Sequence, residues 1–177
     1  MTRAQGNVLY ELDGRPALAL YKEYLGERAA ELPASAMLFP LALRRDRQDK
    51  NLIVRSVQGI DEATQSLRFA GDIPEGSLAQ LMRTTIDQLI QGAETAAHDA
   101  AAACLPHDTG LAFAVSCVGR KLVLGQRTDE ETEATLSAMP KGMAQIGFYS
   151  YGEISPTDGG LCDLHNQTMT LTLLWET

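Results

Sequence analysis

A ten-residue stretch rich in tyrosine and glycine, residues 145–154, restricts the fold more than any other part of the sequence. Its residues favour a β-strand, in which successive side chains point to opposite faces. One face would be mainly apolar and would contain Ile146, Phe148, Ser150 and Ile154. The other would form a polar row of Tyr149, Tyr151 and Glu153. The stretch predicts either a strand with one solvated face or a rigid element that presents polar groups to a ligand.

Two glycines interrupt this stretch, Gly147 and Gly152. Glycine within a strand often marks a bulge or a place where another backbone or a ligand comes close. We therefore expect a close approach of another part of the molecule beside residues 147–152.

Length and charge limit the class of protein. A chain of 177 residues is predicted to form one domain, because compact domains mostly contain roughly 100–200 residues. Its net charge of −8 makes nucleic acid and anionic membranes poor partners, since both are bound by clustered Lys and Arg. No apolar run is long enough to span a bilayer, and we expect a cytoplasmic protein.

The three cysteines are Cys104, Cys117 and Cys162. They are odd in number and lack the CxxC spacing of zinc sites, so neither a disulfide framework nor a thiolate metal site is expected. Three free thiols are typical of a reducing compartment.

The order of predicted elements indicates an α+β fold. Strands are expected at residues 7–14, 37–43, 51–57, 66–70, 111–117, 145–154 and 164–175. Pro16 and Gly26 would bound a first helix, and a capping box of Ser77 and Gln80 would open a long helix of roughly 27 residues. A second capping box at residues 128–131 would open a short helix. We expect a mixed, largely antiparallel sheet with the long helix and shorter helices packed on it.

The best candidates for ligand contacts follow the apolar strand 111–117. Cys117, Gly119 and Arg120 lie where that strand ends, the end at which open α/β-type sheets tend to bind ligands. Arg120 could hold a carboxylate through two parallel hydrogen bonds. Alternatively, Cys117 is a small core residue, and Arg120 pairs with Glu153 or another acid.

His165 and Asn166 precede the last predicted strand and are candidate ligand contacts as well. His98 and His107 have no metal-ligand spacing with His165, so no metal site is expected. Nucleophile elbows, phosphate-binding glycine loops and paired catalytic carboxylates are missing from the sequence. The sequence predicts a pocket rather than a reaction, and we do not expect an enzyme.

Four blocks of the sequence resemble the C-terminal domain of the FIST family. They are YELDGRPA at 10–17, SCVGR at 116–120, GFYSYGEI at 147–154 and LHNQT at 164–168. The resemblance implies a sensory input module of prokaryotic signal transduction, of a kind proposed to bind amino acids or similar metabolites. Related domains occur in some eukaryotic F-box proteins, and some family members are linked to haem and nitric oxide sensing.

FIST proteins usually have an N-terminal half before this domain, whereas this chain starts almost at the first block. We expect a single C-terminal-like domain, residues 1–177, that lacks this partner half, with homodimerisation as a substitute. Its partners would be a small molecule and either a signalling output protein or the N-terminal half.

The leading hypothesis is a pocket beside the tyrosine-rich strand that binds an amino acid. Arg120 would hold the carboxylate, Glu153 the ammonium group, and Tyr149 and Tyr151 would supply stacking area and hydroxyl groups. No resident cofactor is expected. The alternatives are a haem or redox sensor that uses His165 or Cys117, and an interaction domain in which the tyrosines form a protein interface.

Overall fold

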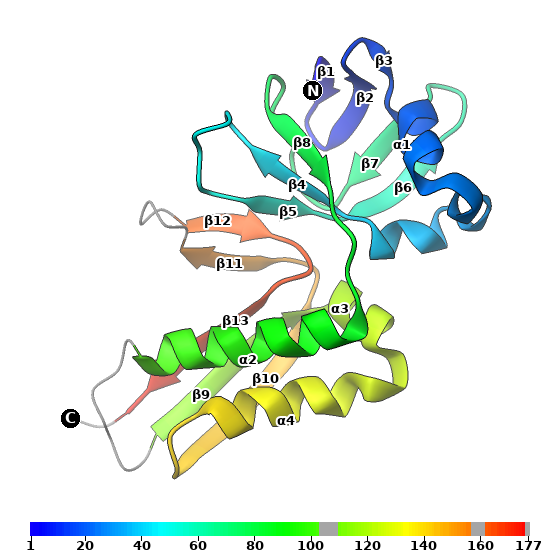
Figure 1. Ribbon diagram of the computed structural model, residues 1–177. Coiled ribbons are helices and arrows are strands. Elements are labelled where there is room, and N and C mark those ends of the chain that lie inside the picture. The colour runs from blue at the N-terminus through cyan, green and yellow to red at the C-terminus, as the bar shows by residue number, and fades with distance from the viewer. Residues whose placement is uncertain (103–109, 157–161, 176–177) are drawn as a thin grey trace. The chain divides into compact units, whose positions relative to one another are not determined.

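The computed structural model describes residues 1–102, 110–156 and 162–175 (Figure 1). Cys104 and His107 lie outside these residues, as does the predicted end of the long helix. The chain divides into two compact units, and each is described by itself. Unit 1 comprises Met1–Arg83 and Ile154–Asn166, and unit 2 comprises Thr84–Glu153 and Gln167–Thr177. Within the described residues, no helix is both long and apolar enough to cross a membrane.

The first sheet of unit 1 has five strands, in the order β1-β2-β7-β6 with β3 paired to β2 (Figure 1). The strands are β1 (Arg3–Gln5), β2 (Val8–Leu12), β3 (Arg15–Pro16), β6 (Val57–Asp61) and β7 (Ser66–Phe69). Helix α1 (Ala17–Leu25) covers this sheet through fully buried Leu18, which shares a core with Leu67 and Phe69.

The predicted turn and first helix are confirmed. Asp13 and Gly14 connect β2 to β3, and both have positive φ, at 50° and 73°. This is the conformation that an Asp-Gly hairpin turn requires. Helix α1 begins directly after Pro16 and ends at Gly26, whose φ of 59° avoids a penalty only because glycine has no Cβ.

A second sheet in unit 1 has the order β5-β4-β8. Its strands are β4 (Leu41–Arg44), β5 (Ile53–Arg55) and β8 (Leu78–Leu81). The predicted meander is therefore divided, because β4 pairs with β5 and β6 pairs with β7, but in different sheets. Before β4, the chain forms the 3₁₀ helices η1 (Gly26–Glu31) and η2 (Ala34–Leu38), so the start of the strand predicted at 37–43 is helical instead. Strands β11 (Glu153–Pro156) and β12 (Cys162–His165) form a separate two-stranded sheet.

The long helix begins eight residues later than predicted. Residues 78–81 form β8 because they complete a ladder with β4, and this pairing outweighs their helical spacing. Helix α2 is Ile86–Ala102. Its capping box is formed by Thr85 and Gln88: the Gln88 backbone N–H donates to Thr85 Oγ1 at 3.2 Å, and the Thr85 N–H donates to Gln88 Oε1 at 3.0 Å.

Replacing Thr85 with alanine should therefore lower the free energy of unfolding by about 0.5–2 kcal/mol, because one helix N–H loses its acceptor. The matched control is Thr84→Ala, which removes only a 3.4 Å contact to the Thr85 carbonyl and should change stability by less than about 0.5 kcal/mol. Urea unfolding of both variants measures the difference. Equal losses would contradict the assignment of the cap to Thr85.

Unit 2 contains a three-stranded mixed sheet in the order β10-β9-β13 (Figure 1). Strand β9 (Gly110–Cys117) is central, β10 (Met143–Ser150) is parallel to it, and β13 (Met169–Leu174) is antiparallel. The crossover from β9 to β10 contains α3 (Val118–Leu124), η3 (Gly125–Arg127) and α4 (Thr128–Ala138). Helices α2 and α4 lie side by side, and fully buried Ala97 of α2 packs against Ala112 of β9, as expected for a small-residue helix face on a sheet. Both units together confirm the α+β class.

Candidate functional site

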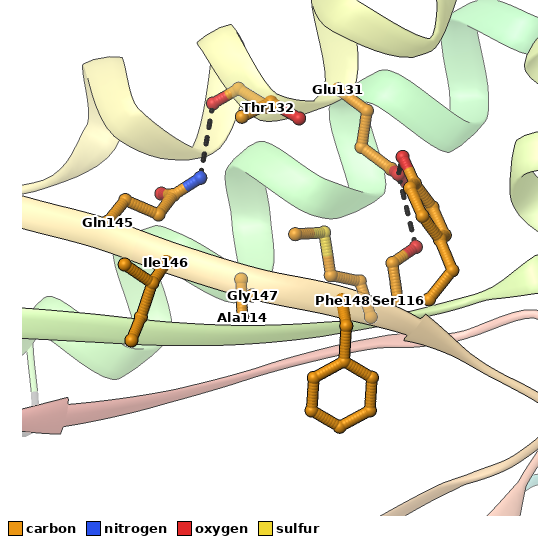
Figure 2. A pocket seen from close by; sticks show the side chains of 10 residues that line it. Ala114, Ser116, Glu131, Thr132, Gln145, Ile146, Gly147 and Phe148 are labelled. Carbon is orange, nitrogen blue, oxygen red and sulfur yellow. Dashed lines mark hydrogen bonds between the residues drawn. The ribbon is translucent and has the colours of Figure 1, made fainter.

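The alternation predicted for the tyrosine-rich stretch holds through Ser150. Figure 2 shows Gln145 pointing toward α4, while Ile146 and Phe148 point to the opposite side of β10. Tyr149 is paired with Ser116 of β9 and shares its face. Because β9 and β10 are parallel, their carboxyl ends meet, and these two hydroxyl groups lie together at that edge.

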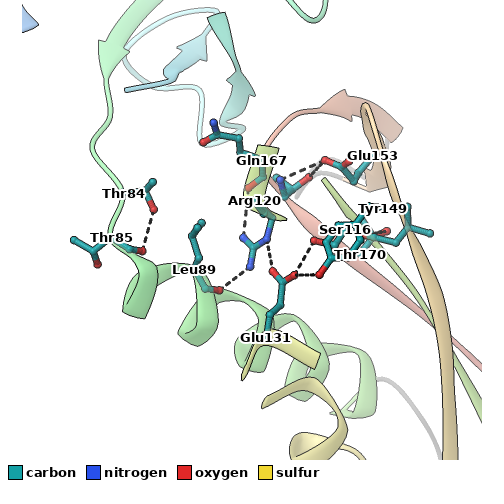
Figure 3. Close-up of polar contacts among 12 residues, drawn as sticks. Thr84, Thr85, Leu89, Ser116, Arg120, Glu131, Tyr149, Glu153, Gln167 and Thr170 are labelled. Carbon is teal, nitrogen blue, oxygen red and sulfur yellow. Dashed lines mark hydrogen bonds and ion pairs between the residues drawn. The ribbon is translucent and has the colours of Figure 1, made fainter. Parts of the chain in front are cut away.

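A buried ion pair lies beside these hydroxyls. Glu131 of α4 is fully buried, and its Oε1 accepts a 2.6 Å hydrogen bond from Nε of Arg120, which is 5% exposed (Figure 3). The other oxygen, Oε2, accepts from Ser116 Oγ at 3.1 Å and from Tyr149 Oη at 3.2 Å. Glu131 thus connects α4 to α3 and to both parallel strands.

The remaining nitrogens of Arg120 are also engaged. Nη2 donates to the Leu89 carbonyl at 2.6 Å and Nη1 donates to the Gln167 carbonyl at 3.4 Å. Of the two interpretations left open by the sequence, the geometry favours pairing of Arg120 with another acid, and that acid is Glu131. Arg120 holds Glu131 in place instead of presenting a free guanidinium group.

Glu131 is the central residue of the candidate site, and the sequence did not indicate it. The pattern at 128–131 predicts a capping box, but no side chain caps α4, and Thr128 Oγ1 donates to the Gly125 carbonyl. Glu131 and Thr135 are four residues apart and therefore share one face of α4, and both are fully buried. Burial, rather than the spacing, identifies this face as the inner one, so the sequence alone provides no signal for it.

A pocket of about 170 Å³ lies between α4 and the sheet of unit 2 (Figure 2). Its polar lining comes from Ser116, Glu131, Thr132, Gln145 and Tyr149. Gly147 also lines the pocket, and Ala114 and Met169 supply apolar walls.

The polar groups of this pocket are mainly hydrogen-bond acceptors. Ser116 and Tyr149 direct their hydroxyl protons to the Glu131 carboxylate, so their oxygens present lone pairs elsewhere. Gln145 donates through Nε2 to Thr135 Oγ1 at 3.0 Å, while its Oε1 is buried with no hydrogen-bond partner in the described part of the chain. A ligand with N–H groups would satisfy these acceptors.

Tyr149 remains protonated at neutral pH. Burial raises the pKa of its hydroxyl to about 12, and the negative charge of Glu131 contributes to this rise. Lys121 places its Nζ 5.0 Å from the centre of the Tyr149 ring, which brings one cation next to this tyrosine.

The predicted polar row of Tyr149, Tyr151 and Glu153 is wrong in its geometry. Strand β10 ends at Ser150, the chain bends at Tyr151, and Glu153 turns back to accept from Ser150 Oγ at 2.8 Å. Ser150 lies on the opposite face from Tyr149, so Tyr149 and Glu153 belong to different clusters. Tyr151 is 78% exposed.

Glu153 forms a second cluster in unit 2, together with Cys117. Its Oε2 accepts from Thr168 Oγ1 at 2.9 Å, and burial raises the pKa of its carboxyl group although these hydrogen bonds oppose the shift. Cys117 is buried at the end of β9, and burial raises the pKa of its thiol, which favours the protonated form. Gly119 is buried within α3.

His165 and Asn166 belong to unit 1. Asn166 donates its backbone N–H to the Val54 carbonyl at 3.1 Å and accepts from the Ser56 N–H at 3.4 Å, so it joins β12 to the strands beside it. His165 is 7% exposed, and burial lowers the pKa of its imidazole, while the charge of Asp163 opposes this shift and the charge of Arg55 adds to it. Of the eight predicted site residues, Arg120 and Tyr149 are brought together through Glu131, and Cys117 and Glu153 form a separate cluster.

Comparison with known proteins agrees with the sequence resemblance. A family model described as the FIST C domain matches residues 17–156. The chain is also 28% identical, over 202 aligned positions, to an uncharacterized protein of Methanocaldococcus jannaschii; the alignment covers 99% of this chain but only 38% of that protein. No solved structure matches. Because the family match covers well over half of the sequence, the chain belongs to the FIST C domain family, a family of sensory modules in signal transduction.

Proposed function

We propose that the chain is a non-enzymatic sensory domain that binds an amino acid or a related small metabolite in the pocket between α4 and the sheet of unit 2. The observation that supports this most directly is the set of acceptors around the pocket: Gln145 Oε1 and the oxygens of Ser116 and Tyr149. An ammonium group supplies three donors and matches such a lining.

Size and charge narrow the ligand class. At about 170 Å³ the pocket is smaller than the roughly 300–1,000 Å³ typical of drug-sized ligands, which favours a compact metabolite. Lys121, next to Tyr149, would attract the carboxylate of an amino acid. Arg120 would not contact the ligand itself but would hold Glu131 in position through their 2.6 Å ion pair.

The same geometry offers a route from binding to signalling. Ser116, Glu131 and Tyr149 come from β9, α4 and β10, so a ligand held by all three would fix the helix against both strands. Arg120 extends the network to α2 through the Leu89 carbonyl. A ligand that prefers this arrangement shifts the population of α4 toward it, and an output protein or an N-terminal FIST half could read that change.

Calorimetric titration with alanine, glycine and serine tests the proposal. Tyr149→Phe keeps the ring but removes one acceptor, so the dissociation constant should rise about tenfold. The matched control is Tyr24→Phe, which removes a hydroxyl from a tyrosine of unit 1 that is 68% exposed and should leave binding unchanged. If both variants and the parent chain bind the amino acids with equal affinity, the ligand does not bind in this pocket.

One observation favours a second candidate function, haem or nitric oxide sensing. His165 Nε2 is buried and has no hydrogen-bond partner among the residues that the structure describes, and a neutral imidazole nitrogen is the form that binds iron. Added haemin should shift its Soret band with the parent chain and with His98→Ala, an exposed control in α2, but not with His165→Ala. No shift in any of the three would discard this candidate.

Exposure of Tyr151 favours a role in contacts with other chains, including a second copy of this one. Sedimentation of Tyr151→Ser beside the parent chain tests this. A dimer that dissociates in the variant supports an interface at Tyr151, and an unchanged association state removes it.

A further inference from the structure

A cavity of about 440 Å³ lies in unit 1 beside β4 and β5, within the size range of ligand sites. Residues of unit 1 alone line it, so its geometry is independent of the pocket in unit 2. One charged side chain in its wall, Arg55 of β5, is 7% exposed. We call this space the β4–β5 cavity.

Arg55 is a buried cation whose hydrogen bonds all go to backbone carbonyls. Its Nε donates to the Asp72 carbonyl at 3.0 Å, and Nη1 donates to the carbonyls of Leu164 at 2.6 Å and Val54 at 3.4 Å. Within residues 1–102, 110–156 and 162–175, it forms no ion pair and its Nη2 makes no hydrogen bond. The carboxylates of Asp72 and Asp163 interact with this charge electrostatically, but neither is close enough to form an ion pair with it. A buried guanidinium group with an unused N–H is costly unless an acceptor completes it.

The position of this guanidinium group is fixed by packing. A Cβ atom at Gly71 would lie 3.0 Å from Arg55 Nε and 3.2 Å from its Cζ, so the absence of a side chain at Gly71 makes room for the group. A preorganised cation binds an anion with a smaller loss of conformational entropy than a mobile one.

Two more polar side chains of the cavity wall have unused hydrogen-bonding capacity. The Asn51 side-chain amide makes no hydrogen bond to a described residue, and its Oδ1 is buried. Since nothing fixes its orientation, the amide can present its NH₂ group to a ligand. The hydroxyl of Ser77, a residue that is 5% exposed, likewise has no partner in the described ranges.

The charge of the lining also favours an anion. Arg44, Arg45 and Arg55 face Asp49 and Asp163, which leaves one net positive charge in a chain whose net charge is −8. Arg45 and Asp49 compensate each other through a 2.9 Å ion pair, which lowers the pKa of the Asp49 carboxyl group. Asp163 makes the site less favourable for a ligand with more than one negative charge.

We propose that the β4–β5 cavity binds a small organic monocarboxylate, at a second ligand site separate from the proposed amino-acid pocket. The carboxylate would accept from Arg55 Nη2, the Asn51 amide and the Ser77 hydroxyl. Its apolar body would lie against Leu43 and Ile53, which also line the cavity. The three unused donors are complementary to a carboxylate, as the acceptors of the unit 2 pocket are complementary to an ammonium group.

Calorimetry and amide NMR with phenylacetate test this site, with phenylacetamide as the neutral comparator and inorganic phosphate as the anion without an apolar body. Phenylacetate should bind at least about tenfold more tightly than either comparator, because only it has both a single charge and an apolar ring. The amide signals of Asn51, Arg55 and Ser77 should shift.

Matched variants locate the site. Arg44→Gln removes an exposed charge of the cavity wall and should raise the phenylacetate dissociation constant about two- to fivefold. Arg47→Gln, in the bend that follows β4 and outside the wall, should leave this constant unchanged. Asp163→Asn should lower the phenylacetate dissociation constant by a similar factor. Arg55→Lys keeps the charge but loses the planar fork, and should weaken binding about tenfold or more if the variant folds.

Several results would overturn the proposal. These are equal binding of phenylacetate and phenylacetamide, equal effects of the Arg44 and Arg47 variants, and amide shifts confined to residues outside the cavity. Stronger binding of phosphate than of phenylacetate would also overturn the assignment to an organic acid. Tyr149→Phe should leave phenylacetate binding unchanged, so failure of this site and failure of the unit 2 pocket are distinguishable.

Discussion

Replacing Glu131 with alanine should lower the free energy of unfolding by about 3–5 kcal/mol, because it leaves the buried guanidinium group of Arg120 without a countercharge. Arg120 is 5% exposed and cannot turn to solvent without opening its contacts to Leu89 and Gln167. The same substitution removes the acceptor of the Ser116 and Tyr149 hydroxyls. Urea unfolding at neutral pH measures the loss.

The neighbouring residue provides the matched control. Glu130 pairs with Arg127 on the surface of α4, at 2.7 Å and with both side chains more than two-fifths exposed. Glu130→Ala should therefore cost no more than about 1 kcal/mol. Comparable losses for the two variants would contradict the account of Glu131 as the centre of a buried network.

Replacing Gly147 with alanine should lower the free energy of unfolding by about 3 kcal/mol, through overpacking between two parallel strands. A Cβ atom at this position would lie 2.0 Å from the Ala114 carbonyl oxygen of β9, which is a backbone atom that cannot move without disturbing the ladder. The clash also adjoins the proposed pocket, so amino-acid binding should be lost together with stability.

Gly92 is the corresponding control within unit 2. It lies in α2, and a Cβ atom added there would meet no atom within 4 Å outside the helix's own backbone and its chain neighbours. Gly92→Ala should therefore raise the free energy of unfolding by about 0.5–1 kcal/mol, as expected for a helix interior. Thermal unfolding of both variants measures these changes in stability, which should have opposite signs. A Gly147→Ala chain as stable as the parent would show that β9 and β10 are not in close contact at this point.

Features encoded by short-range chemistry were predictable from the sequence. The Asp13–Gly14 turn and the end of α1 at Gly26 depend on backbone conformations that few other residues tolerate. The close approach expected at Gly147 is confirmed for the same reason, because a missing side chain constrains the neighbours directly.

Features decided by tertiary contacts were not predictable. The apolar residues at 78–81 have helical spacing, but these residues pair with β4 and form the strand β8. The capping box of the helix is therefore formed later, at Thr85. Glu131 fits a local capping pattern equally well, and only the position of Arg120 in the fold reveals its buried role. Glu153 does not lie in the predicted polar row, because the chain bends after Ser150. The alternation of side chains between two faces predicts which residues share a face but does not predict where a strand ends.

The proposed function depends on recognition of an ammonium group by the acceptors that line the pocket in unit 2. Amide NMR spectra of the chain titrated in parallel with alanine and with propionate, which lacks the ammonium group, test it most directly. Alanine should shift the signals of Ser116, Glu131, Gln145 and Tyr149, while propionate should leave them unchanged. Equal shifts with both compounds, or no shift of these signals with alanine and the other small amino acids, would contradict it.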